Sequence, residues 1–199
     1  MNSLELVGDF VTSLFDRRRY LDDSIALAAL KLLDRKFSKV RGFQSVLMVY
    51  TPEQRERNMP IAAEVFHCRP FNHYVAAVLL SSDVVLYMDS LKPGGKPSRK
   101  IVKQIEESFN LKNRYCIRSS KCQAQKKPDC MVFAIANLDV VLSGNDVSKV
   151  EFYAKTLRGS LVRSLVEDHL SFPFQRCKKR GEINNFCIKL GVNKPSSRR

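Results

Sequence analysis

One segment, from Cys130 to Gly144, constrains the fold of this chain more than any other. It is almost wholly apolar, with one asparagine and one aspartate in its middle. Pro128 and Asp129 before it are typical helix start signals, and Gly144 is a typical stop. A helix that is apolar around its whole circumference has to be buried. The sequence therefore predicts a globular domain built around this helix.

Cys130 would stand in the first turn of that helix, directly after Asp129 as the N-cap. Unpaired backbone N–H groups and the helix macrodipole favour a thiolate at this position. The alternative is a small apolar residue at the start of a core helix, because free cysteines are usually buried. Cys130 is therefore a candidate nucleophile, and its role depends on its partners.

Two apolar runs upstream supply those partners. VAAVLL follows His73-Tyr74, and VVLYM ends at Asp89, with the short break SSD between the runs. This pattern is typical of two adjacent antiparallel strands joined by a turn. His73 and Asp89 would then lie at one edge of the sheet, where the carboxylate can orient the imidazole and the imidazole can deprotonate a thiol. Alone, His73 could be a strand-edge histidine and Asp89 a turn residue, but with Cys130 they form the residue set of a cysteine-nucleophile triad.

In their order and spacing these motifs resemble the ubiquitin-like-protein-specific (SUMO-type) cysteine proteases, including transposon-encoded, virus-encoded and adenain-like relatives. The resemblance covers about residues 20 to 174. It implies an α+β, papain-like fold in the SUMO-protease/adenain arrangement, with a mixed sheet flanked by helices and the nucleophile at a helix N-terminus. The features that carry it are His73-Tyr74, Asp89-Ser90-Leu91, a glutamine before Asp129-Cys130-Met131, the helix start Tyr20-Leu21-Asp22-Asp23, the segment Phe133-Ala134-Ile135-Ala136, and Phe172-Pro173.

The resemblance also implies an oxyanion glutamine, whose side-chain N–H would act together with the backbone N–H of Cys130. Ala124 occupies the position where the family has this glutamine, and Gln125 and Gln123 stand on either side of it. We prefer Gln125, because a loop one residue shorter is an easy change and Pro128 constrains the approach. Gln123 is the alternative.

Substrate contacts are implied for Tyr74, Met131 and Asp23. In the family a tryptophan and a glycine stand where this chain has Tyr74 and Met131, and they shape a narrow tunnel for a substrate that ends in Gly-Gly. The two replacements indicate a different substrate, a rearranged tunnel or a catalytically weakened relative.

The function predicted from the resemblance is a cysteine peptidase or isopeptidase. His73 would be the general base and acid, Asp89 would orient it, and Cys130 would attack the scissile carbonyl. The substrate would be a ubiquitin-like conjugate or precursor, or a viral or element-encoded polyprotein. The alternative is a catalytically weakened, protease-like module that binds a ubiquitin-like protein or nucleic acid. No cofactor is expected, although adenain, which uses DNA as a cofactor, suggests DNA as an activator.

Charge and length set the remaining expectations. The 199 residues carry a net charge of +14, from 34 Lys and Arg against 20 Asp and Glu. We expect one protease-like domain over residues 1–175 and a basic, partly disordered tail over 176–199 that could contact nucleic acid.

A metal site at His67, Cys68 and His73 would lack a fourth ligand, so no metal is predicted. The six cysteines have no disulfide framework, and no apolar run would span a bilayer, so we expect an intracellular protein of the nucleus or cytoplasm, with no membrane contact.

Periodicity predicts the other elements. Helices are expected at 3–16, 22–37, 98–109 and 147–170, strands at 46–50 and 114–118, and a loop at 51–60.

Overall fold

The structure, a computed structural model, describes residues 20–21, 23–43, 62–68, 72–112, 114–125, 128–176, 181 and 183–188. The helix expected at 3–16, the strand at 46–50 and the loop at 51–60 lie outside these residues. The elements are α2 (Asp23–Lys36), β1 (Arg41–Gly42), β2 (Ala62–Cys68), β3 (His73–Ser81), β4 (Val84–Met88), α3 (Arg99–Ser108), β5 (Tyr115–Ser120), α4 (Cys130–Leu142), a 3-10 turn (Val147–Lys149), β6 (Val150–Phe152), α5 (Leu157–Val166), β7 (Phe174–Arg176) and β8 (Ile183–Ile188).

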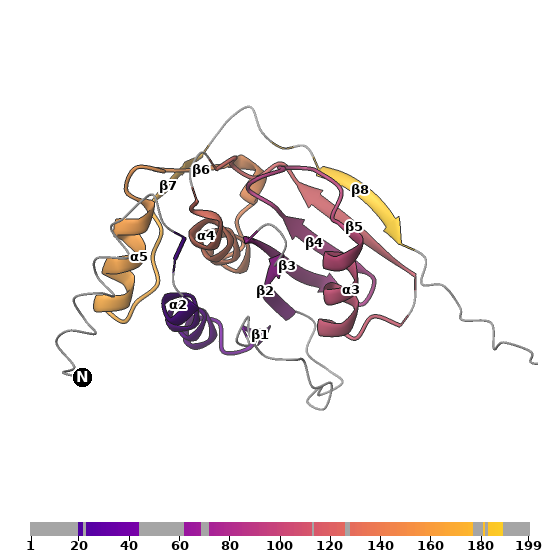
Figure 1. Cartoon of the computed structure of the whole chain (residues 1–199), viewed down its shortest axis with the longest axis horizontal. Coiled ribbons are helices and arrows are strands. Elements are labelled where there is room, and N and C mark those ends of the chain that lie inside the picture. Colours follow the sequence, from indigo (N-terminus) through magenta and orange to yellow (C-terminus); the bar gives the residue numbers. More distant parts are fainter. Residues whose placement is uncertain are drawn as a thin grey trace, which may run out of the picture.

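A six-stranded mixed sheet forms the centre of the molecule, in the order β1-β2-β3-β4-β5-β8 (Figure 1). Strand β3 runs antiparallel to both β2 and β4, and β8 runs antiparallel to β5. The pairs β1–β2 and β4–β5 are parallel. The predicted pair of strands on either side of the SSD break is therefore confirmed as β3 and β4. Strand β2 was not predicted, because AAEVFHC is rich in alanine and contains a charged residue, both of which weaken a strand signal.

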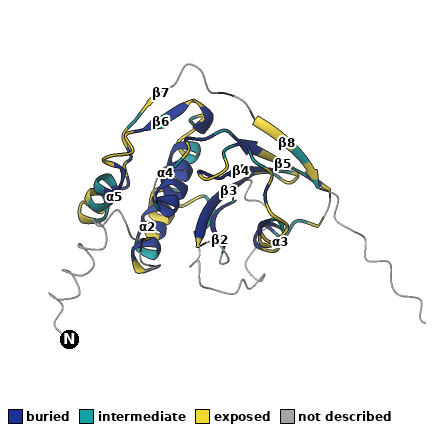
Figure 2. Ribbon diagram, turned by 45° about the horizontal axis from the view of Figure 1, so that its top comes forward, coloured by how far each residue is buried: buried dark blue, intermediate teal, exposed yellow. Residues whose placement is uncertain are grey.

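Alternation along β3 divides the core into two layers. Tyr74, Ala76 and Val78 belong to the hydrophobic cluster that includes α4. Val75 and Ala77 belong to the cluster that includes α3. Successive strand residues point to opposite faces, so each face of the sheet is covered by one of these helices (Figure 2).

Helix α4 is the central element, as the sequence predicted. Every residue from its start to Val140 is buried. Its closest partner is β3, and it also contacts α2 and α5. Such a helix holds its first residue, Cys130, in a fixed position against the sheet.

The helix expected at 147–170 is only partly correct. Val150–Phe152 forms β6, which pairs with β7, and the helix begins only at Leu157. The carboxamide of Gln123 explains the difference, because it accepts a hydrogen bond from the Phe152 N–H at 2.6 Å and donates one to the Phe152 carbonyl at 3.3 Å. These contacts fix extended backbone at a position where hydrophobic periodicity alone favoured helix.

Part of the segment expected to be a basic tail forms a strand of the main sheet. Ile183–Ile188 forms β8, the edge strand of the main sheet, with Tyr115 opposite Ile188 and Ser120 opposite Ile183. The segment was expected to be a tail because it is basic and poor in large apolar residues. A strand that covers only one edge needs few buried side chains, so its sequence signal is weak.

None of the helices in the described ranges combines the length and the apolar character needed to cross a membrane.

Candidate active site

His73 and Asp89 meet at one edge of the sheet. His73 is the first residue of β3 and Asp89 follows the last residue of β4. Their side chains are joined by a hydrogen bond of 2.7 Å between the imidazole Nε2 and the carboxylate Oδ1, and both residues are buried. The strand pairing inferred from the sequence therefore does bring the two residues together.

The Asp89 carboxylate is held by several further donors. Its Oδ1 accepts backbone N–H bonds from Leu91 at 2.8 Å and Lys92 at 3.1 Å, and its Oδ2 accepts the Tyr87 hydroxyl at 3.1 Å. Burial acts to raise the pKa of Asp89, but the His73 imidazole and the two backbone N–H groups outweigh burial and lower it. The carboxylate therefore stays ionised and has one fixed orientation toward the imidazole.

Cys130 interacts with the same imidazole. Burial acts to lower the pKa of His73, but hydrogen bonds to Asp89 and to Cys130 outweigh it and raise that pKa to about 9. Since Asp89 occupies Nε2, the nitrogen left for the sulfur is Nδ1. The Cys130 Sγ also lies 3.9 Å from the carbonyl oxygen of Asn72, a residue in the left-handed region at φ 43°. The thiol is only 1% exposed.

The two candidate glutamines have different environments. Gln123 is buried and both ends of its carboxamide bond to Phe152, as described above. Gln125 is half-buried, its Oε1 accepts the Ser90 hydroxyl at 2.5 Å, and its backbone N–H donates to the Ser90 carbonyl at 2.8 Å. Because Ser90 follows Asp89 directly, Gln125 is tied to the same turn that positions the carboxylate. The role of Gln125 as the oxyanion donor stays a prediction.

Asp129 is the N-cap residue of α4, as the sequence predicted, but its side chain does not make the expected capping contact. Its side chain makes no capping hydrogen bond and is instead paired with the Arg158 guanidinium. Arg158 is 3% exposed, and it also donates to the Pro128 carbonyl at 3.0 Å. A buried cation needs an anion, and Asp129 supplies it, so the carboxylate turns away from the helix N–H groups. Arg158 was not singled out from the sequence, where it is one of many arginines.

Comparison with solved structures gives several close matches in fold. The chain aligns with SUMO protease Ulp1 with its catalytic cysteine oxidised to a sulfonic acid, at 18% identity over 86% of this chain and 88% of that chain, with a TM-score of 0.64. It aligns with the C-terminal Ulp1 protease domain in complex with Smt3, the yeast orthologue of SUMO, at 16% identity over 82% and 83% of the two chains, with a TM-score of 0.62. A third match is the Ulp1-like SUMO protease catalytic domain of Chaetomium thermophilum, at 16% identity over 78% and 75%, with a TM-score of 0.58.

This chain has the fold of the Ulp1 SUMO protease domain. The predicted α+β arrangement is thereby confirmed. No protein-family model matches the sequence, and no curated protein matches it.

The residues expected to contact substrate lie in different surroundings within the Ulp1 fold. Tyr74 and Met131 are both buried in the cluster around α4. The Tyr74 ring stacks on His67, with ring centroids 4.4 Å apart and planes 11° apart. Asp23 is the first residue of α2, and its side chain lies outside the described part of the structure.

His67 therefore has a structural partner, and its Nε2 also bonds to the Asn72 Oδ1 at 3.1 Å. Within the described residues, no group of three or more His, Cys, Asp or Glu side chains is arranged to hold a metal ion.

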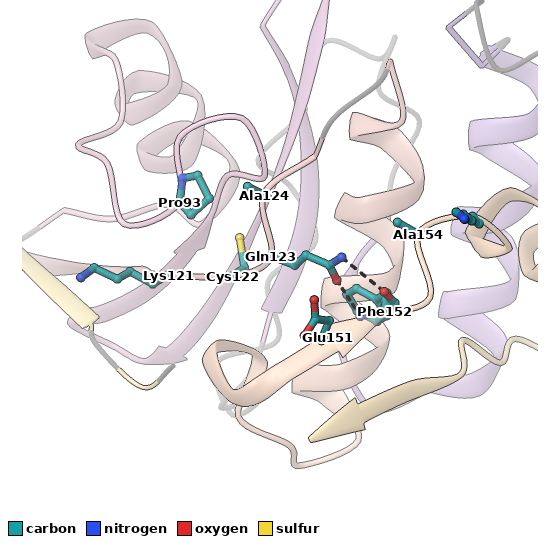
Figure 3. Close-up of a pocket in the computed structure, with 9 residues that line it drawn as sticks. Pro93, Lys121, Cys122, Gln123, Ala124, Glu151, Phe152 and Ala154 are labelled. Atoms are coloured by element: carbon teal, nitrogen blue, oxygen red, sulfur yellow. Dashed lines mark hydrogen bonds between the residues drawn. The ribbon is translucent and has the colours of Figure 1, made fainter. Parts of the chain in front are cut away.

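A cavity of about 680 Å³ lies beside the loop that leads to Gln125. It is lined by Pro93, Lys121, Cys122, Gln123, Ala124, Glu151, Phe152, Ala154 and Lys155 (Figure 3). Gln123 crosses it to reach Phe152, and no member of the His73, Asp89 and Cys130 cluster lines it. The cavity is therefore separate from the thiol.

Proposed function

We propose that this protein is a cysteine peptidase or isopeptidase in which Cys130, His73 and Asp89 are the catalytic residues. The single observation that carries the proposal is the buried His73 imidazole, which is hydrogen-bonded to Asp89 and whose pKa is raised by its interactions with both Asp89 and Cys130. The Ulp1 fold supports it, because the matching Ulp1 domain is a SUMO protease with a catalytic cysteine, and Cys130 is the first residue of the central helix α4 here.

The proposed reaction is the hydrolysis of an amide bond through a thioester on Cys130. His73 holds the proton that the Cys130 thiol gives up, and the thiolate attacks the scissile carbonyl carbon. The oxyanion that forms accepts hydrogen bonds from the Gln125 side chain and the Cys130 backbone N–H. The imidazolium then gives its proton to the leaving amine, and a thioester remains. Water, deprotonated by His73, hydrolyses the thioester and releases the acid.

Asp89 has two effects in this sequence of steps. Its hydrogen bond fixes the imidazole with Nδ1 toward the sulfur, and its charge stabilises the imidazolium. The raised pKa of His73, about 9, fits a histidine that remains protonated until the leaving amine needs the proton. Because the imidazole is already oriented, the reaction does not have to overcome the entropic cost of orienting it.

The proposed substrate class is a ubiquitin-like protein, as a conjugate or a precursor, and a polyprotein is the second option. The support comes from the Ulp1 domain solved in complex with Smt3. Met131 follows Cys130 and Tyr74 follows His73 in the chain. Methionine is bulkier than the glycine, and tyrosine more polar than the tryptophan, that the resembling family has at these positions. The substrate can therefore end in a sequence other than Gly-Gly, and the probes should include other C-terminal sequences as well as Gly-Gly. Six cysteines without a disulfide framework favour a reducing compartment, so the proposed location is the nucleus or cytoplasm.

The experiment is labelling with a panel of ubiquitin-like proteins that carry an electrophilic C-terminus. We expect one probe to form a covalent adduct at Cys130, mapped by peptide mass spectrometry. Cys130→Ala should abolish the adduct, while Cys122→Ala, which removes another buried thiol, should keep it. Labelling that persists in Cys130→Ala, or that moves to Cys122, would contradict the proposal.

A second candidate function is a protease-like module that binds a ubiquitin-like protein without cleaving it. The observation in its favour is the 1% exposure of Cys130, next to the bulky Met131. This candidate predicts saturable binding of a ubiquitin-like protein with no adduct at Cys130, even after long incubation with the probe. Rapid adduct formation would exclude it.

A further inference from the structure

The positive charge of this protein is concentrated between Asp89 and Asp129. Residues 90–128 contain eleven lysines and arginines and two glutamates, a net charge of +9 in a chain whose total is +14. Excess charge of this density on a folded surface creates a strong local potential for anions.

Helix α3 presents several of them on one exposed face. Ile101 and Ile105 are its buried anchors on the sheet, and Arg99, Lys100 and Lys103 are exposed. Lys103 makes a loose contact of 3.7 Å with Glu107. Figure 1 shows α3 on the side of the sheet away from α2 and α5. The outer face of α3 is therefore both basic and open to a partner.

The loop before α3 adds to this surface because it is fixed to the sheet edge. The Gly94 N–H donates to the Ser120 carbonyl at 2.9 Å, the Gly94 carbonyl accepts the Asn184 amide at 2.7 Å, and the Gly95 carbonyl accepts the Ser119 hydroxyl at 2.8 Å. Gly94 has φ 74°, and a Cβ there would lie 2.9 Å from the Lys121 Cγ, so the tight approach needs glycine. The contacts hold the loop that contains the exposed lysines Lys92 and Lys96.

The first turn of α3 has an unusual charge. Its N-cap is Ser98, whose hydroxyl accepts the Ile101 N–H at 3.3 Å, and no acidic residue stands in the first turn. The positive end of a helix dipole favours acidic side chains, but Arg99 and Lys100 occupy these positions. The two cations are repelled by the positive end of the helix dipole, and an anion bound beside them would offset this repulsion.

The chemistry of the surface distinguishes between classes of polyanion. Between Lys92 and Lys121, the described residues include no exposed large hydrophobic side chain. Protein interfaces have an apolar core and are depleted in lysine, and helices that lie on membranes insert apolar residues. A row of cations without an apolar centre fits a phosphate backbone instead. The helix is ~15 Å long, from its ten residues, which spans about four phosphates of one DNA strand.

We propose that the exposed face of α3, together with the Lys92–Lys96 loop, binds the phosphate backbone of nucleic acid without sequence preference. This surface differs from the basic tail at 176–199 that the sequence suggested. The proposal does not depend on peptidase activity, since binding can be measured without a substrate.

The test compares two triple variants of equal charge. Lys96→Gln, Arg99→Gln and Lys100→Gln neutralise the proposed surface. Lys31→Gln, Lys39→Gln and Arg163→Gln remove the same charge from exposed positions on or beside α2 and α5. Affinity for a short fluorescein-labelled DNA duplex of mixed sequence is measured by anisotropy at several salt concentrations, with circular dichroism as the check on folding. A third variant replaces Lys178, Lys179 and Arg180 of the tail with glutamine.

We expect the α3 triple variant to bind the duplex roughly tenfold or more weakly, and to lower the slope of log affinity against log salt by about 3. The control triple variant should lose much less. An equal loss in the two variants would overturn the proposal, because binding would then follow net charge alone. A loss confined to the tail variant would also overturn it. Displacement of the duplex by polyglutamate at equal charge concentration would point to an acidic protein partner instead.

Discussion

Replacing Arg158 with methionine should both destabilise the protein and change the reactivity of its nucleophile. Arg158 is buried and pairs with Asp129, the residue directly before Cys130. Breaking a buried ion pair from one side leaves an uncompensated charge and costs about 3–5 kcal/mol. For a domain of this size, that cost lowers Tm by roughly 6–20 °C. Thermal unfolding measured by circular dichroism gives this quantity directly.

The direction in which the substitution shifts the pH dependence of Cys130 alkylation distinguishes an effect on the nucleophile from a loss of stability alone. In Arg158→Met the unpaired Asp129 carboxylate stands at the start of α4, beside the sulfur, and a nearby negative charge disfavours a thiolate. The pH at which the rate of iodoacetamide alkylation at Cys130 rises should therefore be higher in Arg158→Met than in the parent protein. In Asp129→Asn the negative charge is gone and the guanidinium remains, so the same profile should move to lower pH.

A second ion pair on the same helix provides the control. Lys36 donates to the Asp139 carboxylate at 2.6 Å, near the other end of α4. Lys36→Met should lower stability without moving the alkylation profile of Cys130. If Arg158→Met and Lys36→Met shift the profile equally, or if Asp129→Asn shifts it in the same direction as Arg158→Met, Arg158 has no specific role at the nucleophile.

Three further predictions concern the site and the core. Because the pKa of His73 is raised to about 9, kcat/KM should fall above about pH 9 as the imidazolium is lost, and Asp89→Asn should move that decline to lower pH in a pH–rate profile. Gln125→Ala should lower kcat roughly a hundredfold or more, whereas Gln123→Ala should mainly lower Tm by freeing the Phe152 backbone; the reverse result would assign the oxyanion role to Gln123. Asn137→Leu should stabilise the protein by about 1–3 kcal/mol in urea titrations, because both polar atoms of this buried side chain lack a hydrogen-bond partner in the structure; a loss of stability would mean that the site cannot hold the larger side chain.

The parts of the fold that the sequence predicted depend on local signals. The α4 helix, the β3–β4 pair and the α3 helix with its Ser98 cap all have periodicity and boundary residues within their own segments. The meeting of His73 with Asp89 followed from the same source, since two adjacent antiparallel strands place their outer ends together. The choice of Gln125 over Gln123 as the oxyanion donor stays a prediction, since no local signal separates the two glutamines.

What the sequence did not predict depends on contacts between distant segments. β6 is extended because Gln123 reaches it from 29 positions away, and Asp129 leaves its capping role because Arg158 reaches it over the same separation. Neither interaction changes the local pattern of the segment that it affects. Strand β8 has no apolar alternation that separates it from a solvated tail, and only its pairing with β5 reveals it.

The position of β8 leads to a prediction about the C-terminus that differs from the one for a simple tail. Deleting residues 189–199 should leave the Tm almost unchanged, because β8 ends at Ile188. Deleting 181–199 should lower the free energy of unfolding by about 2–4 kcal/mol. The deletion removes two half-buried side chains on the α3 face, Phe186 and Ile188, and the backbone pairing with β5. The entropy of the strand that no longer has to be ordered offsets part of this loss. The same deletion removes Asn184, which bonds to Gly94, so the Lys92–Lys96 loop should exchange its amide hydrogens faster in the longer deletion than in the shorter one. Equal Tm values and equal exchange in the two proteins would show that β8 is not an integral strand of the sheet.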